Sequence, residues 1–389
     1  MERYASCVRL RPEYRERYLE LHAQVWPEVE SMLAAANIRN YTIFMRGDML
    51  FSYYEYVGTD HAADPGAHPR RSRDPALVAV DRSLSGKASR HAGGRAVGAA
   101  DGSLAPEPMR VIDAHVHLWD PGRLRYSWLD GTELDRLIDA STLRAASGTV
   151  TDFVVVQADC ADTQGLAEVE WLVEQSGELP GLRGIVAFAP LERGAEVRDY
   201  LDALRAIPSV VGVRRLIQDE RPGFAVADRF LDGVAALADF ELTFDVCVRS
   251  GQLGEVIELV SRTPDVQFVL DHVGKPRIGA DPSRWRLQIA ELAARRNIVC
   301  KLSGLMTEIV SGPTGVEAVE PFLSYALAEF GPDRCLFGSD WPVMTAAATY
   351  SEWLDAVIRL VPGEDERRAV MAGTAERVYE LSASATGGS

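Results

Sequence analysis

The chain has 389 residues, 47% of them hydrophobic and 25% charged, which is the composition of a folded globular protein. Its net charge of -16 argues against nucleic acid as a partner, and no apolar run reaches the roughly 18 residues that a membrane-spanning helix needs. The first residues show no secretion signal and the five cysteines are scattered, so we expect a cytoplasmic protein without a disulfide scaffold or a membrane partner.

Residues 1–59 are predicted to form a partial ferredoxin-like α+β segment. The stretch YASCVRL is typical of a strand, and PEYRERYLELHAQV has the spacing of a helix, with Tyr18 and His22 on one face. The stretch IRNYTIFMRGDMLFSYYEYVG alternates and turns at residues 46–48, which indicates a hairpin. The closing helix and strand of a complete unit are absent, so the remaining sheet has edges that favour a homo-oligomer.

Residues 60–109 differ from the rest of the chain in composition. The stretch 61–110 contains no Phe, Trp or Tyr and consists largely of Ala, Gly, Arg, Asp, Pro and Ser. Such a segment buries too little apolar surface to offset the loss of chain entropy on folding. We interpret it as a low-complexity, poorly ordered linker.

Residues 110–389 are predicted to form an α/β domain, a (β/α)8 TIM barrel. Short β-branched runs alternate there with helical patterns, and these runs are 110–119, 152–158, 182–190, 210–217, 242–248, 267–274, 297–304 and 334–342. Eight strands alternating with helices over about 270 residues match such a barrel in number and size. The rival, a doubly wound open sheet, usually has a glycine-rich first turn, and the sequence contains neither GxGxxG nor a P-loop motif.

Polar side chains are concentrated where the predicted strands end. In a barrel of this kind catalytic groups lie at the carboxyl ends of the strands. The residues at these ends are Asp113, His115, His117, Gln157, Asp159, Arg214, Arg215, Gln218, Asp245, Asp271, His272, Lys275, Lys301, Ser303 and Asp340. A barrel with a purely structural role would not need so many ionisable and amide groups at one rim.

The pair His115 and His117 carries the sharpest chemical signal. Residues two apart in a strand lie on the same face, so the two imidazoles converge on one point, as a metal site or an oxyanion site requires. The alternative is a pair of core histidines bonded to backbone groups. We favour function, because the chain has only seven histidines and three of them fall at predicted strand ends.

Asp340 and His272 are the next candidates. An aspartate that closes the last strand could bind a metal or accept a proton from water, although it could instead cap the following helix. His272 stands alone in the sequence, so a structural hydrogen bond to a loop is a stronger rival there. Asp271 beside it is expected to point to the other face of the strand.

Candidate substrate contacts come from basic, amide and aromatic residues near the same rim. The basic residues Arg214, Arg215, Lys275 and Lys301 could anchor hydroxyl-rich or anionic groups, and structural salt bridges are equally good explanations. Trp119 and Trp341 could form an apolar wall for a sugar, or belong to the core. Gln157 completes this set.

Several motifs in order resemble one branch of the amidohydrolase superfamily. IDAHVHLWDP, GVRRLIQDE, VLDHVGKP, CKLSGLMTE and LFGSDWPV are similar to the amidohydrolase-2 sugar lactonases related to L-fuconolactonase. The resemblance implies hydrolysis of an aldonolactone, an L-fucono- or L-rhamnono-lactone, to the aldonic acid in deoxy-sugar catabolism. By position it implies that His115, His117, His272 and Asp340 are the active-site residues.

The resemblance also bears on the metal. The bridging lysine of dinuclear relatives has no counterpart, because the fourth run ends in Arg214-Arg215. At most one divalent ion, such as zinc on His115, His117 and Asp340, is therefore expected, and members of this branch exist that work without metal.

The expected mechanism uses Asp340 as the base on a water molecule. His115 and His117 hold the metal or bond to the oxyanion, and His272 binds the water or metal or passes a proton to the leaving group. Two other interpretations stay open: a related amidohydrolase that acts on a dicarboxylate lactone or decarboxylates its substrate, and a non-catalytic barrel.

Residues 1–59 resemble L-rhamnose mutarotase and its L-fucose relatives in RYASCVRLRPEYRERYLELHAQVWPEV, IRNYTIF and LFSYYEYVG. In that family a helical histidine and tyrosine transfer protons, which implies roles for His22 and Tyr18. The family pattern ends near Asp60 and its second half is missing, so mutarotase activity and independent folding of this segment stay open.

Overall fold

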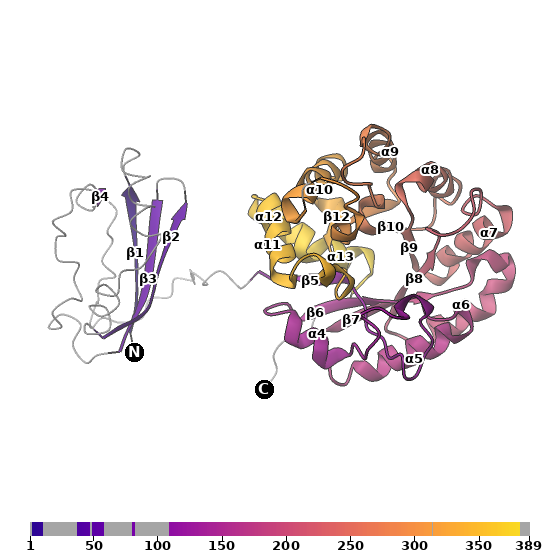
Figure 1. The fold of residues 1–389 in the computed structure, drawn as a ribbon, viewed down its shortest axis with the longest axis horizontal. Coiled ribbons are helices and arrows are strands. Elements are labelled where there is room, and N and C mark those ends of the chain that lie inside the picture. Colours follow the sequence, from indigo (N-terminus) through magenta and orange to yellow (C-terminus); the bar gives the residue numbers. More distant parts are fainter. Residues whose placement is uncertain are drawn as a thin grey trace, which may run out of the picture. The chain divides into compact units, whose positions relative to one another are not determined.

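The computed structural model describes residues 2–10, 37–46, 49–57, 80–81, 109–312 and 314–381. The chain divides into two units, Met1–Gly102 and Ser103–Ser389, which are described separately (Figure 1). Among the described residues, no helix has both the length and the apolar character needed to cross a lipid bilayer.

The first unit contains an antiparallel sheet with the strand order β2-β3-β1-β4. Its strands are β1 (Glu2–Leu10), β2 (Ile38–Arg46), β3 (Met49–Tyr56) and β4 (Val80–Asp81). β2 and β3 pair from Ile38 opposite Tyr56 to Arg46 opposite Met49, which is the hairpin that the sequence predicts. β4 pairs with the end of β1 and falls in the segment expected to be a linker. The predicted helix with Tyr18 and His22 lies outside the described residues.

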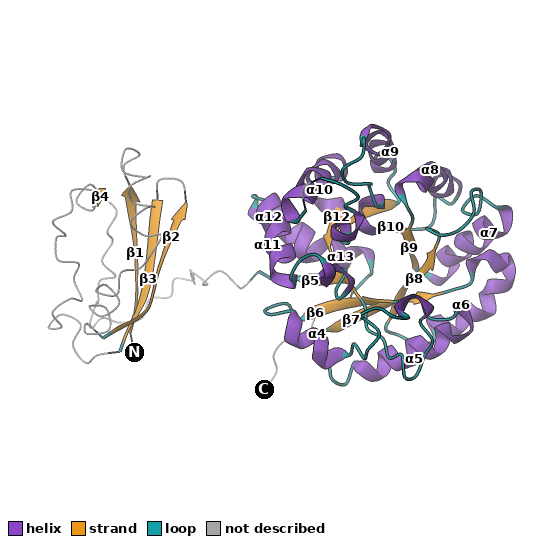
Figure 2. Ribbon diagram, in the orientation of Figure 1, coloured by secondary structure: helices purple, strands orange, loops and turns teal. Residues whose placement is uncertain are grey.

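The second unit is a barrel of eight parallel strands in sequential order, as predicted (Figure 2). The strands are β5 (Ile112–Val116), β6 (Asp152–Val156), β7 (Leu182–Phe188), β8 (Val210–Leu216), β9 (Thr243–Cys247), β10 (Phe268–Leu270), β11 (Ile298–Leu302) and β12 (Cys335–Phe337). Each strand lies within one predicted run. A parallel bridge between Val116 and Trp341 joins the two ends of the sheet and brings the first and last strands together.

Helices surround the ring of strands in Figure 1 and bury apolar faces against it. They are α4 (Ala140–Ala146), α5 (Gly165–Gln175), α6 (Arg198–Arg205), α7 (Asp228–Ala236), α8 (Leu253–Arg262), α9 (Ser283–Ala293), α10 (Val316–Phe330), α11 (Tyr350–Leu360), α12 (Glu364–Arg368) and α13 (Thr374–Val378). In α8 the buried residues Leu253, Val256 and Val260 recur at helical spacing. The outer helices such as α8 therefore hold the strands from outside the barrel.

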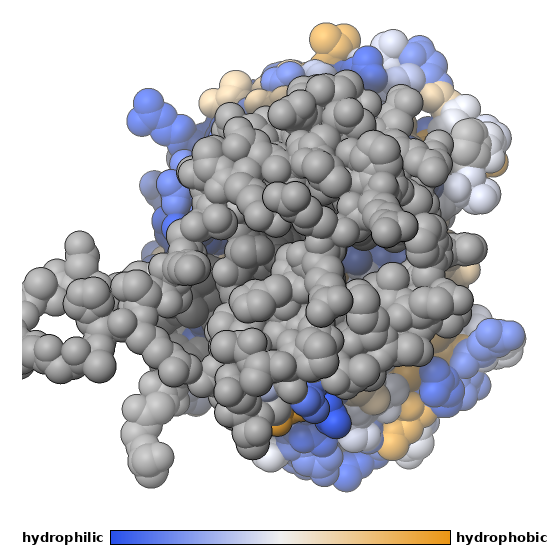
Figure 3. Space-filling model, turned by 90° about the vertical axis from the view of Figure 1, so that its left-hand side faces the viewer, coloured by the Kyte–Doolittle hydropathy of each residue, from blue (hydrophilic) through white to orange (hydrophobic). Residues whose placement is uncertain are grey.

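A second apolar cluster fills the barrel interior and includes the C-terminal segment. Ile112 at the start of β5 and Val154 on β6 belong to it, together with Ala375 of α13 and Tyr379 just after that helix. The large apolar side chains exposed on the barrel, among them Leu137 and Leu287, come from separate elements, and the coloured surface in Figure 3 is mostly hydrophilic.

Candidate active site

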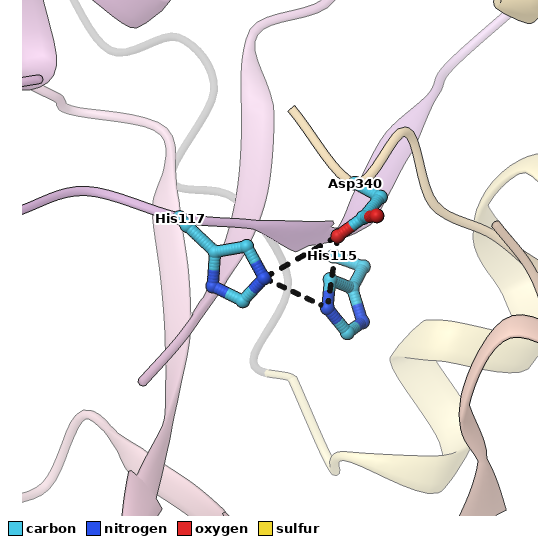
Figure 4. Close-up of side chains that lie close together, drawn as sticks. All are labelled: His115, His117 and Asp340. Atoms are coloured by element: carbon cyan, nitrogen blue, oxygen red, sulfur yellow. Dashed lines mark hydrogen bonds and ion pairs between the residues drawn. The ribbon is translucent and has the colours of Figure 1, made fainter. Parts of the chain in front are cut away.

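Three side chains from the first and last strands converge at the carboxyl edge of the barrel (Figure 4). His115 and His117 lie at the end of β5, and Asp340 follows β12. The two histidine Nε2 atoms are 3.1 Å apart, and Asp340 Oδ1 lies 3.6 Å from Nε2 of His115 and 3.4 Å from Nε2 of His117. None of the three is more than 5% exposed. The residues that the sequence singled out thus form one compact, buried cluster.

Backbone hydrogen bonds between the first and last strands fix this arrangement. The amide of Asp340 donates to the carbonyl of His115, and the amide of His117 donates to the carbonyl of Trp341, both at 2.8 Å. Asp340 has a φ of 63°, in the left-handed region that few non-glycine residues adopt, so these bonds hold a strained residue in place. A β-carbon at Gly338 would lie 2.8 Å from Cβ of His115, so the close approach requires glycine there.

The hydrogen bond of His117 determines which ring nitrogen faces the cluster. Its Nδ1 lies 2.8 Å from the carbonyl oxygen of Val156, which can only accept a hydrogen bond. Nδ1 therefore donates this hydrogen bond, and Nε2 is the ring nitrogen that faces His115 and Asp340.

Asp113 does not join the other residues at the rim. The pairing of β5 with β6 shifts register between Asp113 and Val116, so the regular alternation along β5 is interrupted. Asp113 accepts hydrogen bonds from the amide of Ser339 at 2.8 Å and from the hydroxyl of Tyr350 on α11 at 2.7 Å. It is a structural carboxylate that braces the last strand and α11.

His272 lies in the cluster together with Asp271, and the expectation that Asp271 points away is wrong. β10 ends at Leu270, and His272 has a φ of 53°, so strand alternation no longer applies. The rings of His272 and His115 are 4.5 Å apart, and Asp271 Oδ1 lies 3.2 Å from Nδ1 of His115. A β-carbon at Gly304 would lie 2.1 Å from Nδ1 of His272, so glycine leaves room for this ring.

Lys301 is fully buried and bonded to the protein's own carboxylates. Its Nζ lies 2.6 Å from Oδ2 of Asp245, 3.1 Å from Oδ1 of Asp271 and 3.2 Å from Nδ1 of His115. Its charge is already matched inside the barrel, so of the two explanations that the sequence left open for Lys301 the contacts favour the structural salt bridge.

The adjacent arginines on β8 face different surroundings. Nη1 of Arg214 lies 3.3 Å from Nε2 of His115 and 3.5 Å from Oδ2 of Asp271, and its Nη2 donates to the carbonyl of Gln157. The guanidinium of Arg215 instead pairs with Glu192 at 3.2 Å and Glu220 at 2.6 Å. Of the two, Arg214 joins the cluster and Arg215 does not.

Of the other predicted substrate contacts, Gln157 and Lys275 have polar surroundings, whereas Trp119 and Trp341 belong to the apolar core. Gln157 is buried, and its Nε2 has no hydrogen-bond partner among the described residues, so it has a free donor beside Arg214. Nζ of Lys275 donates to Oε1 of Gln218 at 2.7 Å. Trp119 is a core residue whose Nε1 bonds to backbone carbonyls of the loop after β5. Trp341 is 4% exposed and packs in the outer apolar cluster.

The charges of the cluster follow from burial and from mutual contacts. Burial acts to raise the pKa of Asp340, but His272, His117 and His115 stabilise the carboxylate, and its pKa lies below its ordinary value. Burial lowers the pKa of His272 to about 4. At neutral pH the site therefore combines an ionised Asp340 with a neutral His272, as a general base beside a neutral imidazole requires.

The spacing of His115, His117 and Asp340 fits one divalent ion. A tetrahedral zinc ion with ligands at about 2.0–2.1 Å separates its ligand atoms by about 3.3 Å, and the three separations here are 3.1, 3.4 and 3.6 Å. Among the described residues, one other group has metal-like spacing, His115 with Asp271 and His272, but its carboxylate is paired with Lys301.

A parallel barrel with these groups at its carboxyl edge is the site of a hydrolase that activates water. A family model described as amidohydrolase matches residues 112–381, and the chain belongs to the amidohydrolase family. The model of L-rhamnose mutarotase matches residues 3–76, which extends past the predicted end of the first segment at residue 59. The resemblance found in both parts of the sequence is thus confirmed.

Individual relatives agree with this division. L-fucono-1,5-lactonase of Burkholderia multivorans is 33% identical over 290 residues, 69% of this chain and 96% of the relative. A zinc-bound crystal structure of a Burkholderia multivorans amidohydrolase has a TM-score of 0.64 and 32% identity, and the match covers 70% of this chain and 100% of that chain. L-rhamnose mutarotase of Sinorhizobium fredii is 34% identical over 71 residues, 18% of this chain and 68% of the relative.

The sequence carries a signal for the buried charge network formed by Asp245 and Lys301. Asp245 and Lys301 each place a single charge in an otherwise apolar strand, TFDVC and IVCKL. Opposite charges in two buried strands predict a pair, because an unpaired charge there would be very costly.

Proposed function

We propose that the chain hydrolyses a sugar lactone, L-fuconolactone or L-rhamnonolactone, to the aldonic acid in deoxy-sugar catabolism. The observation that carries the proposal is the ionised Asp340 carboxylate beside two imidazole nitrogens at the carboxyl edge of the barrel. Similarity to L-fucono-1,5-lactonase over almost its whole length supports the substrate class. The mutarotase segment supports a 6-deoxy sugar, since a mutarotase acts on the parent sugar.

In the proposed reaction Asp340 accepts a proton from water as the water oxygen attacks the lactone carbonyl. The carbonyl electrons move onto its oxygen, and groups beside His115, including the Arg214 guanidinium, stabilise that charge. The ring carbon–oxygen bond then breaks, and the ring oxygen takes the proton from Asp340. An ester leaving group needs little protonation, so the neutral His272 can position water without acting as a strong acid.

We propose that the site binds at most one divalent ion, held by His115, His117 and Asp340. A zinc ion bound there would polarise the lactone carbonyl and lower the pKa of water. Arg214, Lys275 and the free amide of Gln157 are proposed to bind the lactone oxygens. Arg215 and Trp119, which the sequence also suggested, have their side chains engaged elsewhere.

The structure disfavours the two alternatives. A dicarboxylate substrate needs several converging cations, and of the adjacent arginines only Arg214 joins the cluster, while the charge of Lys301 is matched by Asp245 and Asp271. Burying an ionised aspartate beside three imidazoles costs free energy, and such clusters are typical of catalytic sites rather than of a non-catalytic barrel.

Acid release from a panel of lactones tests the proposal. We expect turnover of L-fucono- and L-rhamnono-lactones, and Asp340→Asn should lower kcat by about 10²–10⁴-fold while the circular dichroism spectrum stays unchanged. Assays with and without a chelator, with bound zinc measured, decide whether the metal is used. Turnover of a dicarboxylate lactone alone, or near-normal rates for Asp340→Asn, would refute the proposal.

We also propose a cytoplasmic location and a small-molecule partner. The four cysteines of the barrel are free and buried, which fits a reducing compartment. Light scattering of the full chain decides whether it forms the homo-oligomer that the sheet edges of the first unit favour.

A further inference from the structure

A second group of polar side chains, Gln218, Lys275 and Glu308, lies at the same edge of the barrel as Asp340. They come from the segments that follow β8, β10 and β11, and each is only partly buried. We propose that this group is the subsite that binds the ring hydroxyl groups of the lactone, and that Glu308 determines the preference for a polyhydroxylated lactone. This inference rests on the proposed function and extends it from the reacting carbonyl to the rest of the sugar.

Backbone hydrogen bonds bring the segments after β10 and β11 side by side. The amide of Ile278 donates to the carbonyl of Glu308 at 3.1 Å, and the amide of Val310 donates to the carbonyl of Ile278 at 2.9 Å. Lys275 has a φ of 45°, and its amide donates to the carbonyl of His272 at 2.8 Å. The same tight turn therefore brings His272 into the active-site cluster and the side chain of Lys275 toward Glu308.

The three side chains keep hydrogen-bonding atoms available for a ligand. Nζ of Lys275 donates to Oε1 of Gln218 at 2.7 Å, which leaves further donors on both the ammonium and the amide. Oε1 of Glu308 lies 4.0 Å from Nζ of Lys275, which is too far for a hydrogen bond, and the carboxylate accepts no side-chain hydrogen bond from the described residues. The group therefore combines an acceptor with several donors. A sugar hydroxyl, which both donates and accepts, matches this combination.

Electrostatic effects show that this subsite lies near the reacting atoms. Burial lowers the pKa of Lys275, but anions that include Asp340 and Glu308 raise it above its ordinary value, so the ammonium stays charged. Burial raises the pKa of Glu308, Asp340 adds to this effect, and Lys275 and Arg249 oppose it. Asp340 thus acts on both charged members of the group. A lactone ring with its carbonyl at Asp340 therefore has the subsite beside it.

Such a subsite discriminates by the hydroxyl groups of its ligand. A sugar lactone supplies partners for the Glu308 carboxylate and the Lys275 ammonium, whereas a lactone without hydroxyl groups displaces water from them and offers nothing in return. The alternative is that Glu308 only balances the charge of Lys275. That structural role predicts equal effects of a Glu308 substitution on lactones with and without hydroxyl groups, so the two interpretations differ in a measurable way.

The test compares L-fucono-1,5-lactone with δ-valerolactone, which has the same lactone ring and no hydroxyl groups. In Glu308→Gln we expect the ratio of kcat/KM for the sugar lactone to kcat/KM for δ-valerolactone to fall about 10–100-fold, mainly through KM of the sugar lactone. Glu220→Gln is the control, because it makes the same change at a carboxylate that follows β8 and pairs with Arg215 at 2.6 Å. It should leave the ratio within about threefold. A smaller fall in Glu308→Gln than in this range would overturn the inference.

Gln218→Leu provides a second variant if Glu308→Gln does not fold. It removes the amide that holds Lys275 and one donor of the subsite, so the same ratio should fall at least about threefold. A ratio equal to that of Glu220→Gln would contradict the inference.

Binding of 1,5-anhydro-L-fucitol separates this inference from the proposed function. This cyclic ether keeps the ring hydroxyl groups and has no carbonyl, so its affinity reports on the subsite without hydrolysis. In NMR titrations of the full chain, we expect binding at least about tenfold weaker in Glu308→Gln than in Glu220→Gln. If no lactone is hydrolysed while this difference is found, the proposed function fails and the inference stands. Equal affinities in the two variants, or no binding to the wild type, would overturn the inference.

Discussion

At the scale of single residues, the chemistry depends on which atoms of His115 and its neighbours face one another. His115 lies against Asp271 and Lys301 at Nδ1 and against Arg214 at Nε2, and the neighbouring Asp340 is held ionised by imidazoles. Each of these side chains is buried, so the contacts act with little screening by water. Small changes at this scale should therefore have large effects on rate.

The two adjacent arginines provide a matched comparison. Arg214→Gln should lower kcat/KM at least about tenfold, because the buried guanidinium beside His115 supplies positive charge to the site. Arg215→Gln should change kcat/KM by less than about threefold, since its partners are Glu192 and Glu220. Steady-state kinetics on the lactone checks both. Equal losses in the two variants would contradict the assignment of Arg214.

The buried carboxyl group of Glu168 should make the free energy of unfolding depend on pH. Burial raises its pKa to about 7, above the ordinary value of 4.5, so the folded state binds a proton more tightly than the unfolded state. Relative to Glu168→Gln, the wild type should gain stability as pH falls from 7 to 4.5, by at most about 3 kcal/mol. Urea unfolding of both proteins across that range measures the difference. A constant difference would show that Glu168 does not titrate in this range.

At the scale of secondary-structure elements, the ends of the strands decide which side chains meet. The pairing of β5 with β6 changes register after Asp113. β10 ends at Leu270, and the residues that follow it, beginning with His272, have left-handed backbone conformations. These two irregularities send Asp113 toward α11 and bring Asp271 and His272 to His115 together. Strand alternation alone predicts the His115 and His117 pair correctly and the Asp271 side chain wrongly.

A substitution at Gly304, which follows β11, tests whether the ends of the strands position the side chains of the site. It has a φ of +63°, and an added β-carbon would lie 2.1 Å from Nδ1 of His272. Gly304→Ala should therefore displace the ring, lower kcat at least about tenfold and destabilise the fold by about 2–4 kcal/mol. Gly331→Ala is the control, because its φ is +77° and no atom lies within 4 Å of the added carbon. Since its ψ of 159° also lies in a region that is essentially restricted to glycine, Gly331→Ala should cost about 1–3 kcal/mol and spare kcat.

At the scale of the whole molecule, the proposed site belongs to one unit. The barrel has its own two apolar clusters, and every residue of the site lies within residues 112–381, the range of the amidohydrolase match. The mutarotase segment lies in the other unit. Lactone hydrolysis should therefore not depend on the first unit.

Removal of residues 1–102 checks this expectation. We predict that residues 103–389 fold and hydrolyse the lactone with kcat within about threefold of the full chain, because a domain with its own core folds by itself. Circular dichroism and acid release provide the measurements. Loss of activity in a folded truncation would show that the first unit contributes to the site.

The sequence by itself determined the architecture and the members of the three-residue cluster. Periodic apolar runs reflect burial, so eight strands and their order were readable, and His115, His117 and Asp340 fall at strand ends that a barrel must bring together. Only the tertiary structure separated Arg214 from Arg215, paired Lys301 with Asp245, and turned Asp271 toward His115. These outcomes depend on register shifts, left-handed residues and partners distant in the chain, which local patterns do not encode.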